Sequence, residues 1–332
     1  MKPIIITGGA GYIGTHVARE CADQGYLPIV IDKNWSKIQG WRLSKNLQPL
    51  PWNFIEDDCR NLDNRVLTLT NGLVPKTIIH LAGSIDVKES MEKPMDYFYN
   101  NTSSTIDMLQ RAKRMGVESV IFASTAAVYN GSNPIRERKY EPFSEDSKLN
   151  PQNIYGISKL LSEEVIKNSG LRYSIFRFFN AAGASEDSMY GEHHDPETHL
   201  IPNIFQAIKE NRPVNIFGDK YHTKDGTCVR DYIHVKDIAK AHIKALDYMN
   251  KTNNSGIYNL GNWDGISIME ILNTVEEVTG IQVKWKISKN RPGDSAMLIA
   301  NTSRANEILD WYPEFSDIKT IIKDAWNWFQ VI

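Results

Sequence analysis

The chain has 332 residues, of which 41% are hydrophobic, and this is enough apolar material to bury one large core or two smaller ones. Its 38 Lys and Arg nearly balance 40 Asp and Glu, and no basic block occurs, which argues against a nucleic-acid partner. No apolar run reaches the roughly 18 residues of a membrane span, and no charged, apolar leader precedes the first predicted strand. We therefore expect a cytoplasmic globular protein with no membrane partner.

Short β-branched or aromatic runs alternate with helical patterns through the first half of the chain. The predicted strands are residues 4–6, 29–31, 54–55, 78–79, 120–122 and 174–176. This alternation predicts βαβ units and a buried parallel sheet. From 181 to 202 the chain becomes rich in Gly, Ser, Glu, Asp and His, which predicts a long functional loop leading into a smaller α/β lobe.

A glycine-rich segment directly follows the first predicted strand. Gly8, Gly11 and Gly14 are spaced Gly-x-x-Gly-x-x-Gly and open a helix. Such glycines let a pyrophosphate approach the backbone at a helix N-terminus, although a tight structural turn would also explain them. Asp32, about twenty residues further on, ends the second strand, where a carboxylate binds the adenosine ribose. The pattern predicts a doubly wound Rossmann domain that binds NAD, and Lys33 keeps NADP open as the alternative.

Other residues predicted to contact the cofactor lie in this loop or where later strands end. They are Tyr12, Ile13, Lys33, Asp58, Cys59, Leu81, Ala82, Gly83 and Ser124. Turn chemistry at strand ends explains each of them equally well when it is taken alone. The cysteines Cys21, Cys59 and Cys228 have no Cys-x-x-Cys spacing, so we expect reduced thiols rather than disulfides or a thiolate metal site.

Tyr155 and Lys159 stand at i and i+4 of a predicted helix, so their side chains share one face. The apolar stripe expected on this helix is Ile157, Leu160, Leu161 and Val165. Moving a tyrosine pKa from about 10 to near 7 requires about 4 kcal/mol, which a lysine and a nicotinamide charge can supply. The phenolate would then act as general base, with Thr125 at the end of the fifth strand holding the reacting oxygen. An exposed, ordinary Tyr and Lys pair is the alternative.

A second pair, Tyr232 and Lys236, has the same spacing. Its alternating residues predict a strand that runs into a helix at Asp237, which would not place both side chains on one helical face.

At this point the sequence resembles the UDP-glucose 4-epimerases, within the extended short-chain dehydrogenases, over nearly its whole length. The matching segments are Thr7 to Gly14, Ser124 to Tyr129, Tyr155 to Lys159, Arg177 to Asn180, Pro196 to Pro202, Asp225 to Val235 and Arg291 to Asp294. The resemblance implies an isomerase with tightly bound NAD, in which Tyr155, assisted by Lys159 and Thr125, deprotonates the sugar 4-hydroxyl. A transient 4-keto sugar would form and be reduced on its other face.

The resemblance also implies roles for individual residues and segments. Asn101 and Phe179 would contact the cofactor. The residues expected to hold the UDP-sugar are Thr125, Asn180, His199, Leu200, Asn215, Phe217, Arg230, Arg291, Asp294 and Leu298. Residues 1–180, with 230–262 returning to them, would bind NAD, whereas 181–229 and 263–332 would bind the UDP-sugar. A homodimer is the expected assembly. No metal is expected, because the acidic and histidine-rich stretch 192–199 is interpreted as a mobile polar loop beside the substrate.

Two positions depart from the family pattern or bear on specificity. Ile85 stands where many such epimerases place a lysine beside the nicotinamide. Leu298 occupies the position that decides whether an N-acetyl group fits at sugar C2, so both UDP-glucose and UDP-N-acetylglucosamine stay open.

Three alternative functions share parts of this pattern. A 4,6-dehydratase would need an acid and a base after Thr125, where Ala126 and Ala127 stand. A UDP-uronic acid 4-epimerase or decarboxylase would need a cation for the sugar carboxylate, which the sequence does not locate. A non-catalytic NAD-sensing module would not need Tyr155 and Lys159 together.

Overall fold

The computed structural model describes residues 1–129, 141–290 and 295–332. Its main body is a seven-stranded sheet in the order β10-β6-β5-β4-β1-β2-β3, in which all neighbours are parallel. The strands are β1 (Lys2–Thr7), β2 (Tyr26–Ile31), β3 (Asn53–Ile55), β4 (Thr77–His80), β5 (Ser119–Thr125), β6 (Arg172–Phe178) and β10 (Gly256–Leu260). The predicted doubly wound parallel sheet is confirmed, and all six predicted strands belong to it.

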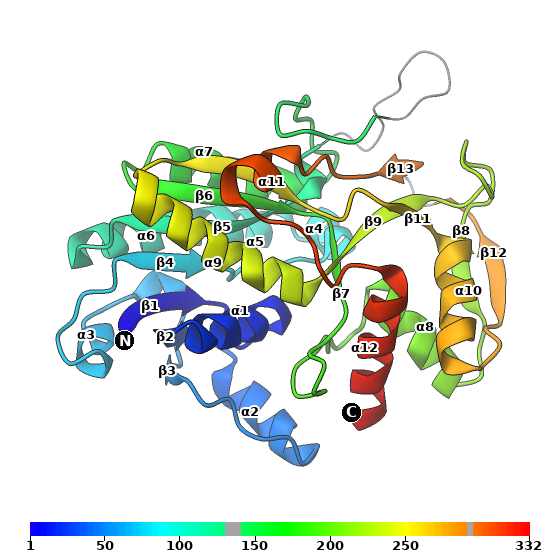
Figure 1. The fold of residues 1–332 in the computed structure, drawn as a ribbon, viewed down its shortest axis with the longest axis horizontal. Helices are drawn as coiled ribbons and strands as arrows, with labels where there is room; N and C mark the ends of the chain where they lie inside the picture. The colour runs from blue at the N-terminus through cyan, green and yellow to red at the C-terminus, as the bar shows by residue number, and fades with distance from the viewer. Residues whose placement is uncertain (130–140, 291–294) are drawn as a thin grey trace.

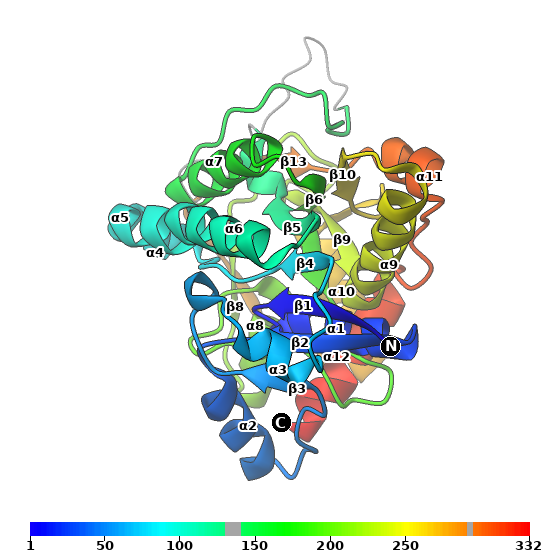
Figure 2. The same cartoon turned by 90° about the vertical axis from the view of Figure 1, so that its left-hand side faces the viewer.

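Helices cover both faces of this sheet, because the side chains of each strand alternate between the two faces. In β1, Ile4 and Ile6 enter one hydrophobic core, whereas Ile5 enters the other. The helices packed into the first core are α1 (Tyr12–Asp23), α2 (Trp35–Ser44), α9 (Val235–Thr252) and α11 (Ser303–Leu309). The second core includes η1 (Cys59–Asn61), α3 (Arg65–Leu69), α6 (Ser104–Met115) and α7 (Ile154–Lys167). Figure 2 shows α6 and α7 on one side of the sheet and α9 on the other.

Beside α7 lie α4 (Val87–Glu92), α5 (Pro94–Tyr97) and the π-helical turn η2 (Phe98–Ser103), which leads directly into α6. A further short helix, η3 (Ala126–Val128), follows β5. The position of η3 leaves the carboxyl end of β5 next to the first turn of α7, where the predicted catalytic residues lie.

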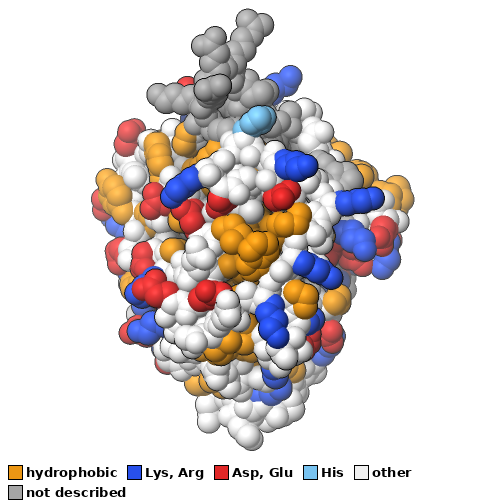
Figure 3. Space-filling view, turned by 90° about the vertical axis from the view of Figure 1, so that its right-hand side faces the viewer, with side chains coloured by type: hydrophobic (Ala, Val, Ile, Leu, Met, Phe, Trp, Pro, Cys, Tyr) orange, Lys and Arg blue, Asp and Glu red, His pale blue; other side chains and the backbone are white. Residues whose placement is uncertain are grey.

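A smaller lobe lies at the carboxyl edge of the main sheet, on the right in Figure 1. Its strands are β7 (Asn180–Ala182), β8 (Val214–Phe217), β9 (Val229–His234), β11 (Gly265–Ser267), β12 (Trp285–Ser288) and β13 (Met297–Leu298). Its helices are α8 (Leu200–Lys209), α10 (Ile268–Thr279) and α12 (Ile318–Val331). They enclose a third core that includes Ile204, Ile271 and Ile321. On the face shown in Figure 3, exposed apolar side chains gather in the middle of the surface.

The apolar stripe predicted for α7 was wrong. Leu161 is 42% exposed, and Leu160 and Val165 pack against two different clusters. The buried positions of α7 are mostly small or polar instead: Gly156, Ser158, Lys159, Ser162, Glu163 and Ile166. The reason is that this side of α7 lines a polar site rather than an apolar core.

Two other expectations concern the chain as a whole. In the part of the chain that the structure describes, no helix combines the length and the apolar character needed to cross a membrane. All three cysteines are buried, and none of them forms a disulfide among the described residues. The second Tyr and Lys pair is split as predicted, because Tyr232 lies in β9 and Lys236 in α9.

Candidate active site

The segment from Gly8 to Gly14 covers the turn after β1 and the first residues of α1, and it leaves almost no room for side chains. Gly8 has φ +70°, and a Cβ there would lie 2.7 Å from the Ala82 nitrogen. A Cβ on Gly14 would lie 2.2 Å from the Gly8 carbonyl oxygen. Gly11 is the N-cap of α1, and no described side chain caps this end. The loop therefore presents backbone N–H groups at a helix N-terminus, as a pyrophosphate requires.

Asp32 lies where the adenosine ribose of a dinucleotide would be expected. Its carboxylate accepts hydrogen bonds from the backbone N–H groups of Ala10, at 3.1 Å, and Asn34, at 2.9 Å. Burial raises its pKa, whereas these two hydrogen bonds lower it. The fixed carboxylate suits a ribose diol. Lys33, which would favour NADP, instead reaches the Asn100 amide oxygen at 3.4 Å.

The remaining strand ends approach the same edge of the sheet. Asp58 caps η1 and pairs with Arg60 at 2.8 Å, and the hydrogen bond from Arg60 holds the pKa of Asp58 below its usual value. Burial raises the pKa of the Cys59 thiol to about 12, so this cysteine is an inert packing residue. Leu81 donates its N–H to the Thr7 carbonyl at 3.0 Å, which fixes the segment after β4 against the glycine loop.

Tyr155 and Thr125 meet at the carboxyl end of β5. A hydrogen bond with Thr125 lowers the pKa of the half-buried Tyr155, but burial, which is the larger effect, raises it above the usual value. The Thr125 hydroxyl also accepts from the N–H of Ala127 at 3.1 Å, so its position is fixed by η3. The structure thus places the two hydroxyls together. A lower Tyr155 pKa would need positive charge close to the phenol, such as that of a bound nicotinamide.

Lys159 is almost fully buried, with 4% of its side chain surface exposed, one turn along α7 from Tyr155. Burial lowers its pKa to about 8, and the carboxylate of Glu163 raises it. Its ammonium lies 4.6 Å from the centre of the Phe122 ring. A Cβ on Gly83 would lie 3.1 Å from the Asn101 amide oxygen and 3.6 Å from the lysine nitrogen. Gly83, Asn101 and Lys159 are therefore neighbours.

Asn101 positions the first turns of α7. Its amide nitrogen donates to the Ser158 hydroxyl and to the Ser84 carbonyl, both at 3.0 Å, and its amide oxygen accepts from the Ser84 N–H at 2.8 Å. The Ser158 hydroxyl in turn donates to the Tyr155 carbonyl at 2.8 Å. Since both polar atoms of the Asn101 amide are bonded within the protein, through these three hydrogen bonds, Asn101 holds the Tyr155 and Lys159 backbone in place.

A buried ion pair between α7 and β6 was not predicted from the sequence. Arg177 of β6 forms two hydrogen bonds with Glu163 of α7, at 3.0 and 2.8 Å, and neither side chain is more than 1% exposed. The Ser124 hydroxyl donates to Glu163, and Arg177 also contacts the Tyr129 hydroxyl at 2.9 Å. Ser124 thus supports the site from below. The sequence could have indicated this pair, because a charged residue lies within each of two buried elements, Glu163 in α7 and Arg177 in β6.

The predicted substrate residues lie in the smaller lobe and along its junction with the main sheet. Asn180 begins β7 and donates to the Asp231 carbonyl at 3.0 Å, and Phe179 is buried just before it. His199 is the N-cap of α8, and Leu200 is the first residue of that helix. Figure 1 shows β7 between the main sheet and α8, so these residues lie where the smaller lobe meets the main sheet.

The other predicted substrate residues lie on three strands. Asn215 and Phe217 belong to β8, where the Asn215 amide oxygen accepts from Ser288 at 3.2 Å. Arg230 of β9 is the partner of Leu298 in β13. Arg291 and Asp294 fall outside the described residues, so the structure does not test them. The arrangement brings Arg230 and Leu298 together, and Leu298 packs against the hydrophobic cluster that contains Phe179.

These observations fit a bound dinucleotide, because Gly8 and Gly14 clear a path for the pyrophosphate while Asp32 offers a ribose carboxylate. A Rossmann domain with a Tyr-x-x-x-Lys helix beside its nucleotide loop defines a short-chain dehydrogenase architecture.

Comparison with known proteins agrees with this architecture. Residues 4–261 match the NAD dependent epimerase/dehydratase family. The UDP-glucose 4-epimerase of Lactobacillus helveticus is 38% identical over 330 residues, which cover 98% of this chain and 96% of that one.

Two solved structures are similar over the full length. UDP-glucose 4-epimerase from Stenotrophomonas maltophila, with bound NAD and formylated UDP-arabinopyranose, has a TM-score of 0.90 and 31% identity, and covers 99% of this chain and 98% of its own. The UDP-Glc/GlcNAc 4-epimerase of Campylobacter jejuni has a TM-score of 0.79 and 35% identity, and covers 100% of both chains. The chain therefore belongs to the NAD-dependent epimerase/dehydratase family.

Proposed function

We propose that this protein is an isomerase of galactose metabolism, a UDP-hexose 4-epimerase that interconverts UDP-glucose and UDP-galactose through a transient 4-keto sugar. One observation carries the proposal. The Tyr155 hydroxyl, hydrogen-bonded to Thr125, lies one helical turn from buried Lys159 at the carboxyl edge of a sheet whose glycine loop fits NAD. The full-length similarity to UDP-glucose 4-epimerases supports the same reaction.

The chain's own residues provide proton transfer and orientation. NAD, held by the glycine loop and Asp32, would supply hydride chemistry to a reaction with no net redox change. Tyr155 removes the proton of the 4-hydroxyl and later gives it back. Thr125 orients that oxygen by a hydrogen bond, and the Lys159 ammonium stabilises the phenolate. Because Lys159 is buried, its charge acts in a poorly screened environment and has a larger effect there than at the surface.

The smaller lobe supplies the proposed UDP-sugar contacts. We assign NAD to residues 1–180 with 230–262, and the UDP-sugar to 181–229 and 263–332. The Arg230 guanidinium suits a diphosphate by bidentate geometry. Leu298, half-buried against the cluster that contains Phe179, would limit space at sugar C2, and its intermediate size leaves room for the N-acetylhexosamine pair as a second substrate.

Proton NMR of the purified protein tests the reaction. We would mix it separately with UDP-galactose and UDP-N-acetylgalactosamine, without added NAD, and follow the anomeric signals. Conversion to the gluco epimers is expected, and the ratio of the two rates measures what Leu298 allows. If neither sugar changes while NAD is present in the protein, the 4-epimerase proposal fails and UDP-uronic acids become the next substrates to test.

The Tyr155→Phe variant tests the mechanism. Loss of a general base typically costs about 10²–10⁴ in kcat, and the variant should retain NAD. Tyr312→Phe is the matched control, because Tyr312 is 57% exposed and lies outside the site. Full turnover by Tyr155→Phe with intact NAD binding would contradict the assignment.

We also propose that the chain forms a homodimer through the helices that flank α7. Exposed apolar residues on α4 to α7 are Val87, Met91, Met95, Tyr99, Ile106 and Leu161, which are 38–74% exposed. These helices lie together on one side of the molecule (Figure 2). Such a concentration of apolar surface is typical of an interface. Sedimentation velocity should give the mass of a dimer, and a monomer at micromolar concentration would refute the proposal.

We place the protein in the cytoplasm, a proposal supported by the buried, free Cys21 and Cys59, since reducing compartments keep thiols unpaired. Cell fractionation followed by immunoblotting tests this location.

A further inference from the structure

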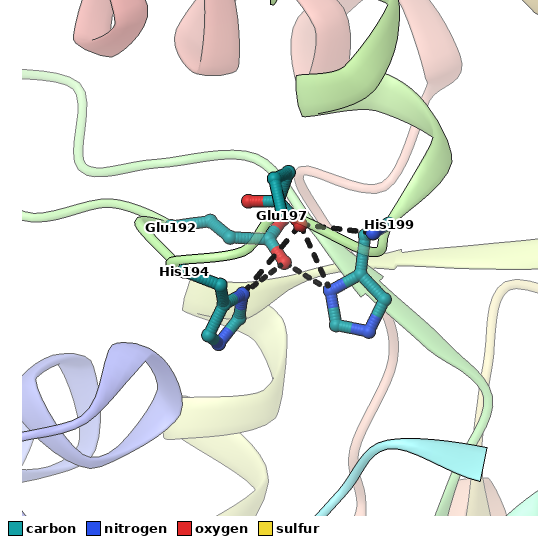
Figure 4. A group of neighbouring side chains, drawn as sticks. All are labelled: Glu192, His194, Glu197 and His199. Carbon is teal, nitrogen blue, oxygen red and sulfur yellow. Dashed lines mark hydrogen bonds and ion pairs between the residues drawn. The ribbon is translucent and has the colours of Figure 1, made fainter. Parts of the chain in front are cut away.

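Four side chains from the loop between β7 and α8 converge on one point. Glu192, His194, Glu197 and His199 each offer one atom, and these four atoms all lie within 4.8 Å of one another. Figure 4 shows both imidazoles turning Nδ1 toward both carboxylates. The spacing Glu-x-His-x-x-Glu-x-His brings the set from only eight consecutive residues. Two imidazole nitrogen atoms and two carboxylate oxygen atoms therefore lie around one common point.

Both carboxylates of this cluster are removed from water. The side chains of Glu192 and Glu197 are only 7% and 3% exposed. Two carboxylates buried so close together repel each other and lose hydration, so they need a compensating positive charge, from a bound cation or from protonated histidines. No Lys or Arg among the described residues forms an ion pair with Glu192 or Glu197.

The orientation of His194 points to an additional ligand. Its Nδ1 is buried and has no hydrogen-bond partner among the described residues, although the Glu192 carboxylate oxygen is only 3.2 Å away. This contact is close enough for an ion pair, but it does not have the geometry of a hydrogen bond. A nitrogen lone pair directed into the space between the carboxylates has the orientation of a metal ligand.

We propose that Glu192, His194, Glu197 and His199 bind one zinc ion. Tetrahedral zinc with ligands at about 2.0–2.1 Å has ligand atoms roughly 3.3–3.4 Å apart. The distances from His194 Nδ1 to the two carboxylates are 3.2 and 3.7 Å, and that from His199 Nδ1 to Glu197 is 4.0 Å. His199 Nδ1 also contacts Glu192 directly. Two carboxylates and two neutral imidazoles make the loaded site electrically neutral, and imidazole and carboxylate ligands suit zinc.

The ion would have a structural role, because four protein ligands leave no open position for a substrate. The loop that carries it is tied to three elements. The Trp328 indole of α12 donates to the Glu192 carbonyl at 2.8 Å, and the ring of His193 stacks on Trp41 of α2 at 4.2 Å. His199 is the N-cap of α8. Zinc would fix the start of α8, and since His199 uses Nδ1 for the metal, its Nε2 stays available for the UDP-sugar.

The inference goes beyond the proposed epimerase reaction and departs from the expectation of a metal-free polar loop. The expectation differed because the sequence pattern does not show that the backbone from 192 to 199 brings these four side chains together. The alternative is a cluster in which protons on both histidines neutralise the carboxylates without any metal. Metal analysis separates these two cases directly.

The first experiment measures zinc in the full-length protein, produced in zinc-supplemented medium and purified without chelators. Inductively coupled plasma mass spectrometry should find about one zinc per chain. His194→Gln should lose it, whereas His193→Gln, which changes the neighbouring histidine outside the cluster, should keep it. Zinc at background level in the wild type, also after dialysis against zinc, overturns the proposal. So does a His194→Gln variant with unchanged zinc.

A second measurement uses only the wild-type chain, in case a variant does not fold. Removal of the ion with 1,10-phenanthroline should lower Tm by on the order of 5 °C, and added zinc should restore it. Cobalt added to the stripped protein should give the intense visible absorption of tetrahedral coordination. No change in Tm and no cobalt spectrum would refute the site. Neither readout depends on epimerase activity, so failure here is distinguishable from failure of the proposed function.

Discussion

The buried pair of Glu163 and Arg177 predicts a large effect from a conservative substitution. Glu163→Gln keeps the shape of the side chain but removes the charge that faces Arg177, whose side chain is 1% exposed. Removing one partner of a buried ion pair typically costs about 3–5 kcal/mol, because the other charge is left in a poorly hydrated place. With an unfolding entropy of about 2.1 cal/mol/K per residue over 332 residues, this loss corresponds to a fall in Tm of about 4–7 °C.

Differential scanning calorimetry at equal NAD content measures this shift, since unequal ligand would itself move Tm. Glu164→Gln is the matched control, because Glu164 is the next residue of α7, its side chain is 51% exposed and it pairs with Lys167 at the surface. Exposed pairs of this kind contribute about 0–1 kcal/mol, so its Tm should change by no more than about 1 °C.

A double variant, Glu163→Gln with Arg177→Met, completes the test. Replacing both charged partners is often close to neutral, so much of the lost stability should return. If Glu163→Gln shifts Tm no more than Glu164→Gln does, the buried pair is not the support that the geometry indicates. If the double variant is less stable than the single one, the cost lies in the lost packing of Arg177 rather than in an unpaired charge.

Two further predictions concern the cofactor loop and the active-site lysine. Gly14→Ala should lose bound NAD, measured as NAD released on denaturation, because its Cβ would lie 2.2 Å from the rigid Gly8 carbonyl; Gly40→Ala, where nothing lies within 4 Å, should keep it. In protein stripped of NAD, burial lowers the Lys159 pKa from 10.5 to about 8. Between these two pH values the unfolded chain holds more protons at this lysine than the folded chain does. The free energy of unfolding of wild type, relative to that of Lys159→Met, should therefore rise from pH 8 to 10.5 by on the order of 3 kcal/mol. Parallel pH profiles of the two proteins would contradict this.

The main sheet was predictable from sequence because its signal is local. Each strand of a parallel sheet is buried on both faces, so runs such as Ile4 to Ile6 and Val120 to Phe122 are apolar without interruption. The glycine loop was equally predictable, since its spacing follows from the space that a pyrophosphate needs at one helix end. Both inferences use only residues that are close in sequence.

The supports of the site were not predictable in the same way. Glu163 and Arg177 lie 14 residues apart on a helix and a strand, and only the packing of α7 on β6 brings them together. The same holds for Gly83, Asn101 and Lys159, which come from three separate elements. Loop 192–199 posed a different difficulty, because a composition rich in Glu and His fits both a solvated loop and a closed metal site. Metal analysis, not composition, separates these two cases.

The error over the apolar stripe of α7 has a physical reason that connects the site with the proposed assembly. An amphipathic helix normally turns its apolar side to the core. In α7 the buried side must instead carry Lys159 and its hydrogen-bonded neighbours, such as Ser162, whose hydroxyl donates to the Ser158 carbonyl at 2.9 Å. Leu161 is therefore left at the surface, 42% exposed. A second copy of the chain packed on this surface would bury Leu161. The polar active site and the apolar outer face of α7 are therefore linked, because polar residues occupy the buried side of this helix and leave an apolar residue on its outer side.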